Sequence, residues 1–314
     1  MRLLTVSRAE AIARDIHLFE LRDAQGAELP AFSAGAHIGV TVPSGLLRKY
    51  SLCNDPAERD RYQIAVKREA CGLGGSASLV DGVRAGDTLP VSDPVNDFAL
   101  APRATQFLFI AGGIGITPIV SMIRHLESTG QGRFRLYYCT RDAPSTAFLD
   151  ELTTARLHGR VRIHHDGGDP ARALDLWPVL EKPTHAHVYC CGPRALMDAV
   201  RDMSGHWPAS AIHFESFAGA AASHKADDRP FRIRLARSGQ VLEVPADASI
   251  LQTLRAAGHR VPSSCESGTC GSCRTGLVSG DVDHRDLVLA DHERADRIMV
   301  CVSRARAGEL VLDL

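Results

Sequence analysis

The chain has 314 residues and a mass of 33.9 kDa, which at about 150 residues per domain predicts two or three domains. Hydrophobic residues make up 45% of the chain and charged residues 23%, a composition that excludes disordered, fibrous and collagen-like proteins. With 36 Lys and Arg against 37 Asp and Glu, the net charge is -1, so no basic surface for a nucleic acid backbone is expected.

No segment of the sequence has the character of a membrane span or a secretion signal. The longest apolar stretch, residues 107–123, is interrupted by glycines and Pro118 and is shorter than the roughly 20 residues that a bilayer span needs. The amino end lacks the sustained apolar region of a signal peptide. We therefore expect a cytoplasmic protein, in which the nine cysteines are not a disulfide framework.

The pattern of apolar residues changes near residue 103. Before it, short alternating stretches at 36–42, 62–66 and 87–91 predict strands of a small antiparallel barrel. After it, continuous apolar runs alternate with amphipathic segments, which is typical of parallel strands buried on both faces and covered by helices. These runs predict an α/β nucleotide-binding domain with strands at 107–111, 134–139, 161–164 and 186–190.

The last part of the chain follows a stretch with almost no large apolar residues, 218–230, which we interpret as a linker. Two apolar segments around Arg237–Gln240 predict a hairpin, and Ser249 is the expected cap of a helix that ends at Gly258. The predicted domains are 1–102, 103–225 and 229–314.

Four cysteines of the third domain stand out by their spacing. Cys265, Cys270 and Cys273 form C-x4-C-x2-C, and Cys301 follows later. This spacing is typical of the thiolate ligands of a plant-type 2Fe-2S cluster. Zinc is the alternative, although zinc modules usually present two separated C-x2-C pairs. The other thiols to which we assign no metal are expected to be small buried apolar side chains: Cys53, Cys71, Cys139 and Cys190.

A glycine-rich turn follows the first apolar run of the α/β domain. Gly113 and Gly115 would let a pyrophosphate approach backbone N–H groups at the start of a helix, with Thr117 as its cap and Pro118 as its first residue. A plain tight turn is the alternative. A second turn, formed by Cys191, Gly192 and Pro193, ends a later buried strand, where ligands of open parallel sheets bind.

The barrel domain carries a possible flavin site. Arg48, Tyr50 and Ser51 could hold a phosphate, stack on an aromatic ring and hydrogen-bond to the edge of that ring. Glycines followed by a hydroxyl at a helix start form an anion site. An exposed strand with a surface turn is the alternative. The further residues that we assign to this site are Val66, Lys67, Gly74, Gly75 and Ser76.

Together these motifs resemble those of the phthalate dioxygenase reductase family, a branch of the ferredoxin-NADP reductase superfamily, over essentially the whole chain. The resemblance implies an antiparallel β-barrel flavin domain, an α/β parallel-sheet nucleotide domain and an α+β plant-type ferredoxin domain of the β-grasp type. It also implies FMN rather than FAD, with Arg48 and Gly74–Ser76 at its phosphate. By the same resemblance, Phe217 lies near the flavin ring and Glu215 near the nicotinamide.

The implied activity is that of a reductase component for a Rieske-type oxygenase or an O-demethylase. NADH would give a hydride to FMN, and the flavin would pass single electrons through the 2Fe-2S cluster to a separate terminal oxygenase. In this hypothesis Tyr50 stacks on the flavin, Ser51 hydrogen-bonds near its reactive nitrogen, and Cys191 lies beside the nicotinamide. Three alternatives stay open: a diiron acceptor, a cytochrome acceptor, and a redox-sensing or carrier protein.

Two further expectations concern the partners. NADH is favoured over NADPH because residues 137–142 contain no cluster of cations for a 2'-phosphate, and Asp166 or Asp169 could contact a ribose; Arg141 leaves NADPH open. We expect a monomer. The ferredoxin domain carries a run of acidic residues that is either a docking surface for the oxygenase or a solvated face: Asp281, Asp283, Asp286, Asp291 and Glu293.

Overall fold

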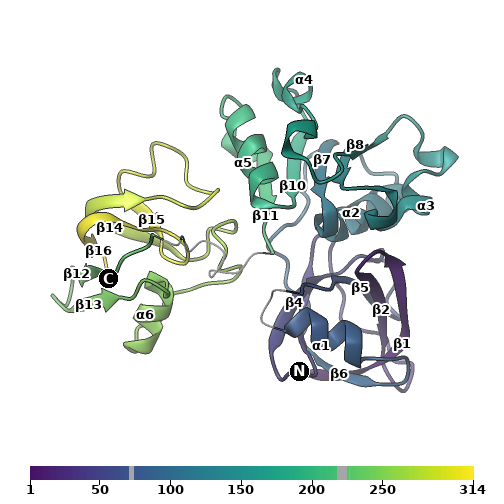
Figure 1. Cartoon of the computed structure of the whole chain (residues 1–314), viewed down its shortest axis with the longest axis horizontal. Coiled ribbons are helices and arrows are strands. Elements are labelled where there is room, and N and C mark those ends of the chain that lie inside the picture. The colour runs from purple at the N-terminus through teal and green to yellow at the C-terminus, as the bar shows by residue number, and fades with distance from the viewer. Residues whose placement is uncertain (71–73, 218–224, 226) are drawn as a thin grey trace. The chain divides into compact units, whose positions relative to one another are not determined.

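The computed structural model describes residues 1–70, 74–217, 225 and 227–314. The chain divides into two compact units, Met1–His213 and Phe214–Leu314, and Figure 1 shows the elements of each. The first two predicted domains contribute most of their residues to one unit, and the predicted domain boundaries stay predictions. Cys71 and most of the predicted linker lie outside the described residues. Every helix in the described part of the chain is too short or too polar to cross a bilayer.

The first unit begins with the predicted antiparallel barrel. Its described strands follow the order β4-β3-β6-β1-β2-β5, and an antiparallel bridge between Leu52 and Ile64 brings the end of β4 to β5. Alternate residues such as Val6, Ile38 and Val66 fill the interior. The elements are β1 (Arg2–Ala13), β2 (Ile16–Arg22), β3 (His37–Thr41), β4 (Leu47–Ser51), β5 (Tyr62–Lys67), α1 (Gly75–Gly82) and β6 (Thr88–Val91).

The same unit continues with the predicted parallel sheet, in the strand order β11-β10-β7-β8-β9. Phe107 and Phe109 of β7 pack with Ile119 of α2 in one core, and α5 lies against β10 (Figure 1). The strands are β7 (Gln106–Gly112), β8 (Arg133–Thr140), β9 (Val161–His165), β10 (His187–Cys191) and β11 (Ile212–Glu215). The α-helices are α2 (Ile116–Thr129), α3 (Leu149–Leu152), α4 (Trp177–Leu180) and α5 (Arg194–Met203). The 3-10 helices are η1 (Gly113–Gly115), η2 (Ala143–Ser145), η3 (Ala155–Leu157), η4 (Pro170–Arg172) and η5 (Ala209–Ala211).

Buried polar contacts join the barrel to the parallel sheet. The Ser121 hydroxyl of α2 donates to the Asn54 carbonyl at 2.8 Å, and Arg124 donates to the Cys53 carbonyl at 2.7 Å. The Tyr189 hydroxyl donates to the Ala99 carbonyl at 3.0 Å. Because these groups are largely removed from water, their hydrogen bonds fix the barrel and the sheet as one unit.

The second unit contains a mixed sheet in the order β13-β12-β16-β14-β15, with α6 packed on it. Its strands β12 and β16 are parallel, and the other neighbours are antiparallel. The predicted hairpin is confirmed: β12 and β13 pair antiparallel, and Gly239 has φ 71 in the connection. The predicted Ser249 cap is also confirmed, because Ser249 and Gln252 form a capping box. The elements are β12 (Phe231–Leu235), β13 (Val241–Val244), α6 (Ile250–Ala256), β14 (Arg274–Asp283), β15 (Arg297–Met299) and β16 (Arg304–Leu312).

Candidate functional site

Arg48 of β4 lies beside the amino end of α1. A Cβ atom on Gly75 would be 2.8 Å from the Arg48 Nε, so the arginine side chain lies directly against this glycine and would have to shift if a side chain stood there. Gly74, the N-cap residue, has φ 79 and supplies no side-chain cap to the helix. The guanidinium and the positive end of the helix therefore converge on one place, and both attract a phosphate group.

The next residues of β4 add an aromatic ring and a buried hydroxyl. The Tyr50 hydroxyl is buried without a hydrogen-bond partner in the described part of the chain. Burial raises the pKa of Tyr50 to about 12, so the hydroxyl keeps its proton. Ser51 is buried and pairs with His37 in the β3–β4 ladder. An unsatisfied donor beside a phosphate-binding helix end fits a flavin, whose polar atoms supply acceptors.

Three other residues that we assigned to the flavin site lie on or after β5. The Val66 side chain is buried in the barrel core, and its assignment to the flavin site stays a prediction. Lys67 forms an exposed ion pair with Glu69 at 2.7 Å, and the Ser76 hydroxyl accepts from the Glu69 backbone N–H at 3.0 Å. β5 also lies beside η1. The strand that ends at Lys67 therefore adjoins the glycine turn of the parallel sheet.

The two predicted turns of the nucleotide site meet at the carboxyl ends of β7 and β10. A Cβ on Gly115 would overlap the Cys191 carbonyl and lie 2.8 Å from the Gly192 nitrogen. A Cβ on Gly112 would be 2.5 Å from the Pro193 ring. Cys191 itself is fully buried. Glycine at these two positions lets the turns pack against each other, while Gly113, where a Cβ would meet no atom, leaves open backbone that suits a pyrophosphate.

The start of α2 differs from the sequence-based prediction. We expected Thr117 as the helix cap and Pro118 as the first helical residue, but α2 begins at Ile116 with Gly115 as its N-cap residue. The Thr117 hydroxyl instead donates to the Ile114 carbonyl at 3.1 Å. The reason is that η1 runs directly into the helix, so the chain is already helical before the threonine.

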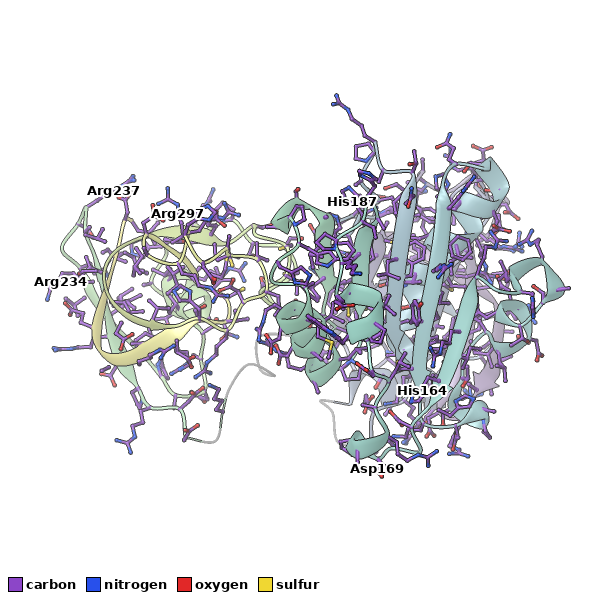
Figure 2. The ribbon with its side chains drawn as sticks, turned by 90° about the horizontal axis from the view of Figure 1, so that it is seen from above. His164, Asp169, His187, Arg234, Arg237 and Arg297 are labelled. Carbon is purple, nitrogen blue, oxygen red and sulfur yellow. The ribbon has the colours of Figure 1, made fainter. Side chains whose placement is uncertain are left out.

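The residues expected near the nucleotide ribose lie in the loop after β9. Asp166 accepts from the Gly168 N–H at 2.7 Å, and Asp169 accepts from the Ala171 N–H at 2.9 Å. Gly168 also faces the Arg141 side chain. Figure 2 shows His164 and Asp169 at the opposite end of the sheet from His187. Arg141 follows the carboxyl end of β8 and the acidic residues follow the carboxyl end of its parallel neighbour β9, so they lie at the same end of the sheet. The preference for NADH stays a prediction.

The four predicted cluster cysteines form two pairs. The Cys265 backbone N–H donates to the Cys270 sulfur at 3.4 Å, and a hydrogen bond from the Cys270 thiol lowers the pKa of Cys265 to about 4. The hydrogen bond between Cys273 and Cys301 likewise lowers the pKa of Cys273 and raises that of Cys301. Two cysteines per iron is the arrangement of a 2Fe-2S cluster.

A single zinc ion fits this arrangement less well. Zinc modules usually present two separated C-x2-C pairs, and the spacing of Cys265, Cys270, Cys273 and Cys301 does not form them. The paired sulfurs instead match the predicted cluster, and the Ser267 N–H donates to the Cys265 sulfur at 3.4 Å, as expected for backbone donors near cluster ligands.

The loop that carries the first three cysteines packs on residues that follow β14. Gly268 has φ 78, and a Cβ there would be 2.7 Å from Val302 and 3.2 Å from the Asp286 Cα. The Leu287 N–H donates to the Gly268 carbonyl at 2.9 Å. The Asp286 carboxylate is fully buried and accepts from the Leu289 N–H at 2.8 Å. Asp286 therefore packs against the cluster loop at Gly268 and supports it.

This position of Asp286 departs from both interpretations of the acidic run, whereas Asp281 and Asp291 are exposed as a solvated or docking face requires. Asp286 is neither solvated nor available for docking, because its carboxylate closes a turn within the domain. Asp283 pairs with Arg285 at 2.7 Å, and Glu293 pairs with Arg274 at 2.9 Å. A sequence pattern shows charge but not burial, and it therefore missed the supporting role of Asp286.

Glu215 and Phe217 follow the boundary between the two units, which falls within β11. Glu215 ends β11, and Phe217 is 47% exposed. Between them, the Ser216 carbonyl accepts from the Ser267 hydroxyl of the cluster loop at 3.3 Å. The roles that we assigned to Glu215 at the nicotinamide and to Phe217 at the flavin stay predictions.

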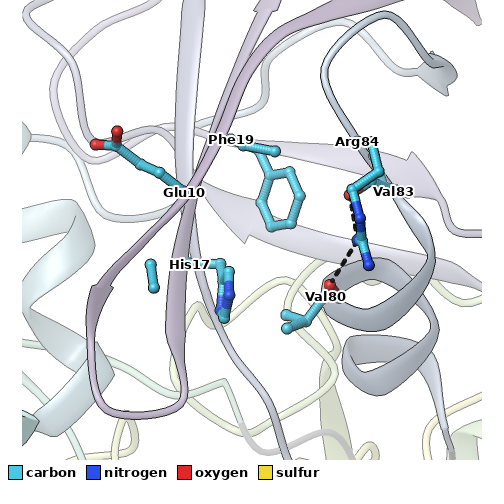
Figure 3. A pocket seen from close by; sticks show the side chains of 8 residues that line it. Glu10, His17, Phe19, Val80, Val83 and Arg84 are labelled. Carbon is cyan, nitrogen blue, oxygen red and sulfur yellow. Dashed lines mark hydrogen bonds between the residues drawn. The ribbon is translucent and has the colours of Figure 1, made fainter.

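The predicted cofactor residues line neither of two surface cavities. The first, in Figure 3, has a volume of about 180 Å³ and lies between β1, β2 and the carboxyl-terminal half of α1. Its lining includes Glu10, His17 and Arg84, and Arg84 donates to the Val80 and Val83 carbonyls. The second, of about 610 Å³, lies at the amino ends of β7 and β8. Both are separate from the glycine turns.

The remaining thiols behave as expected of small apolar side chains. Cys53 and Cys190 are fully buried, Cys139 is half-buried, and all three are free. Burial raises the pKa of Cys53 to about 12 and that of Cys139 to about 11, so these thiols stay protonated.

Three family models match the chain, in the order that the motifs predict. Residues 3–99 match an oxidoreductase FAD-binding domain, residues 109–202 an oxidoreductase NAD-binding domain, and residues 233–306 a 2Fe-2S iron-sulfur cluster binding domain. The expected flavin, pyridine nucleotide and 2Fe-2S cluster are therefore confirmed as the cofactor classes of this chain, and the predicted three-part fold is confirmed with them.

The chain is also similar to whole proteins along its full length. It is 58% identical to phthalate dioxygenase reductase of Burkholderia cepacia over 99% of this chain and 97% of that protein. It is 59% identical to the phthalate 4,5-dioxygenase oxygenase reductase subunit of Pseudomonas putida, over 99% and 96%. A solved phthalate dioxygenase reductase structure, described as modular and as transferring electrons from pyridine nucleotides to [2Fe-2S], superposes with a TM-score of 0.73 over 100% of this chain and 98% of that one, at 58% identity. The chain belongs to the phthalate dioxygenase reductase family of oxidoreductases.

Proposed function

We propose that this chain is the reductase component of a Rieske-type oxygenase or O-demethylase and carries electrons from NADH to a separate terminal oxygenase. The observation that carries the proposal is the presence on one chain of three sites in order: the phosphate-binding end of α1, the paired glycine turns and the paired cluster cysteines. Relatives similar over their whole length are named as reductases of phthalate dioxygenase systems, which supports an oxygenase as the acceptor.

The chemistry of the cofactors explains why all three sites are needed. When bound, NADH gives two electrons as a hydride, the flavin accepts the pair and releases electrons singly, and the 2Fe-2S cluster passes them on one at a time, with a proton released to solvent. The residues of this chain hold and orient these groups. Arg48 and α1 bind the flavin phosphate, and the buried Cys191 excludes water beside the nicotinamide.

Within this proposal the flavin is FMN. The matched domain model is described as FAD-binding, but Arg48 and the amino end of α1 form a compact cation and helix-end site for a terminal phosphate. Flavin released from the purified protein and separated by chromatography should comigrate with FMN. Comigration with FAD would contradict this part of the proposal.

The proposal also includes a monomer in the cytoplasm with a preference for NADH. The free thiols of Cys53, Cys139 and Cys190 are compatible with a reducing compartment. The acidic residues in the loop after β9 favour NADH over NADPH. Rates of flavin reduction by the two nucleotides, compared under anaerobic conditions, test the preference.

The function is tested with anaerobically purified protein. Its visible spectrum should show flavin and iron-sulfur absorption, and both should bleach when NADH is added. NADH-dependent oxygen consumption should then appear with a purified Rieske-type oxygenase and its aromatic substrate. Rapid turnover only with a diiron protein or a cytochrome would identify a different acceptor, and bleaching without turnover with any acceptor would favour a redox sensor.

A further inference from the structure

A buried ion cluster holds the segment that leads into β12. The Asp228 carboxylate accepts two hydrogen bonds from the Arg285 guanidinium, at 2.6 and 2.9 Å, and Arg304 Nε lies 3.5 Å away. The side chains of Asp228, Arg285 and Arg304 are 6%, 9% and 3% exposed. Asp228 lies outside the part of the chain that matches the cluster-binding domain, residues 233–306.

The buried ion cluster of Asp228, Arg285 and Arg304 connects several segments of the second unit. Arg285 also donates to Asp283 at 2.7 Å, and Asp283 pairs with Lys225 at 3.3 Å. Arg304 donates to three backbone carbonyls, those of Arg229, Pro245 and Ala248. Because two buried guanidinium groups face one another here, a carboxylate between them is needed to balance their charge. The hydrogen bonds from Arg285 hold the pKa of Asp228 far below its ordinary range.

The ion pairs of Asp228, Arg285 and Arg304 are connected directly to the residues that support the loop of cluster cysteines. Arg285 precedes Asp286, whose backbone packs on Gly268, and Leu287 donates to the Gly268 carbonyl at 2.9 Å. The Arg285 backbone N–H donates to the Ser303 hydroxyl at 3.4 Å, close in sequence to Cys301. The Asp228 carboxylate thus binds Arg285, and the next residue, Asp286, packs against the loop that carries Cys265 and Cys270.

We infer that Asp228 is a positioning residue for electron transfer: it fastens the entering segment to residues 283–289 and so holds those residues against the loop of cluster cysteines. The inference rests on the proposed function in one respect: electrons pass through the 2Fe-2S cluster whose ligands this loop carries. Its consequence is twofold. Loss of the carboxylate loosens the support of the loop, and it leaves Arg304 without this negative partner and Arg285 with Asp283 alone, next to the residues that pack on the cluster loop.

The test uses the full chain with Asp228→Asn, which keeps the shape and removes the charge, and Asp227→Asn as the matched control at an exposed neighbour. With Asp228→Asn, the reduction potential of the 2Fe-2S cluster should shift upward, because added net positive charge favours the reduced state. Trypsin cleavage after Arg285 should become about tenfold faster, since this arginine is buried and the bond that follows it is reached only by local opening. Asp227→Asn should leave the potential and the cleavage rate unchanged, and Asp228→Glu should restore most of both.

Reduction of the flavin by NADH should stay at its normal rate in Asp228→Asn, because the flavin and nucleotide turns lie in the first unit. If Asp228→Asn does not fold, Arg285→Lys tests the same contact, because it keeps the charge and loses the bidentate hydrogen bond. If trypsin then cleaves Arg285→Lys at the normal rate or more slowly, the inference is overturned. An unchanged potential together with unchanged cleavage in Asp228→Asn would also overturn it. If NADH bleaches neither chromophore in the unaltered chain, the proposed function fails, and the cleavage comparison still decides the inference.

Discussion

At the scale of single residues, two tyrosines of the barrel offer a matched comparison. The Tyr50 hydroxyl is buried without a partner in the described chain, whereas the Tyr62 hydroxyl donates to the Pro30 carbonyl at 2.6 Å. Tyr50→Phe should leave the free energy of unfolding of the flavin-free protein unchanged or higher, because it removes an unsatisfied group. It should weaken flavin binding about fivefold, the loss of one hydrogen bond of about 1 kcal/mol. Quenching of flavin fluorescence measures the affinity.

Tyr62→Phe is the control for this prediction and should have the opposite effect. It should lower the free energy of unfolding by about 1 kcal/mol, because the Pro30 carbonyl loses its donor, and it should leave flavin affinity unchanged. Equal flavin affinities of Tyr50→Phe and the unaltered protein would show that the Tyr50 hydroxyl does not meet the flavin.

His213 gives a residue-scale prediction on pH. Burial, and secondarily His187, lowers the pKa of His213 to about 4. Its Nε2 lies 3.0 Å from Nδ1 of His187, and its ring stacks on Tyr189 at 4.3 Å. The unfolded chain takes up the proton at about pH 6.5, before the folded chain does. Stability therefore is complete above pH 6.5 and falls as the pH drops toward 4, by about 2 kcal/mol after allowance for partial exposure.

The measurement is the free energy of unfolding from denaturant titrations between pH 7 and pH 4. His213→Phe keeps an aromatic ring on Tyr189 but cannot take up a proton, so its stability should fall less steeply over this range. His206→Phe, at an exposed ring, is the control and should keep the slope of the unaltered protein. A slope for His213→Phe equal to that of the control would contradict the prediction.

At the scale of elements, the close approach of the two nucleotide turns depends on Gly115. A methyl group there would overlap the backbone at Cys191 and Gly192, whereas one on Gly113 meets no atom and costs only its left-handed conformation, φ 54. Gly115→Ala should therefore lower the melting temperature clearly more than Gly113→Ala, whose strain costs about 1 kcal/mol. It should also weaken NADH binding by at least about tenfold, because β7 and β10 must separate. Thermal unfolding and NADH titration test both effects.

How far the sequence predicted these elements depended on whether the determining contacts are local. The buried run at 107–111 became β7 because continuous apolar residues favour parallel strands, and Ser249 and Gln252 cap α6 within one turn. The segment 161–164 also became a strand, β9, but at the edge of the sheet and without a buried residue. The start of α2 was placed too late because η1 precedes it. The bridge between Leu52 and Ile64 joins residues distant in the chain, so no local pattern shows it.

The candidate site divides in the same way. The spacing of Cys265, Cys270 and Cys273 predicted the cluster because three ligands lie within one loop. The support of that loop by Asp286, and the pairing of Asp228 with Arg285, depend on burial and on long-range packing. Charged residues in a sequence are usually solvated, and the exceptions become visible only when a fold buries them.

At the scale of the whole molecule, the order of the sites sets a one-way dependence between the two units. The flavin and nucleotide turns that serve hydride transfer lie in Met1–His213, with Glu215 and Phe217 expected beside them from just past that boundary, whereas delivery of single electrons requires the four cluster cysteines of Phe214–Leu314. A defect at these cysteines should therefore stop electron delivery and spare the first reaction, while a defect in the first unit should stop both.

Cys270→Ser separates the two reactions in the full chain. Serine offers a hard oxygen in place of the soft thiolate that iron-sulfur clusters prefer, so the cluster should be lost or incomplete. Reduction of cytochrome c by NADH should then fall by at least about tenfold, while NADH still bleaches the flavin at its normal rate, because hydride transfer takes place in the other unit. Cys139→Ser, at a half-buried thiol that is not a predicted ligand, is the control and should retain both reactions. Undiminished cytochrome c reduction by Cys270→Ser would mean that the flavin delivers electrons directly and that the cluster is not the relay.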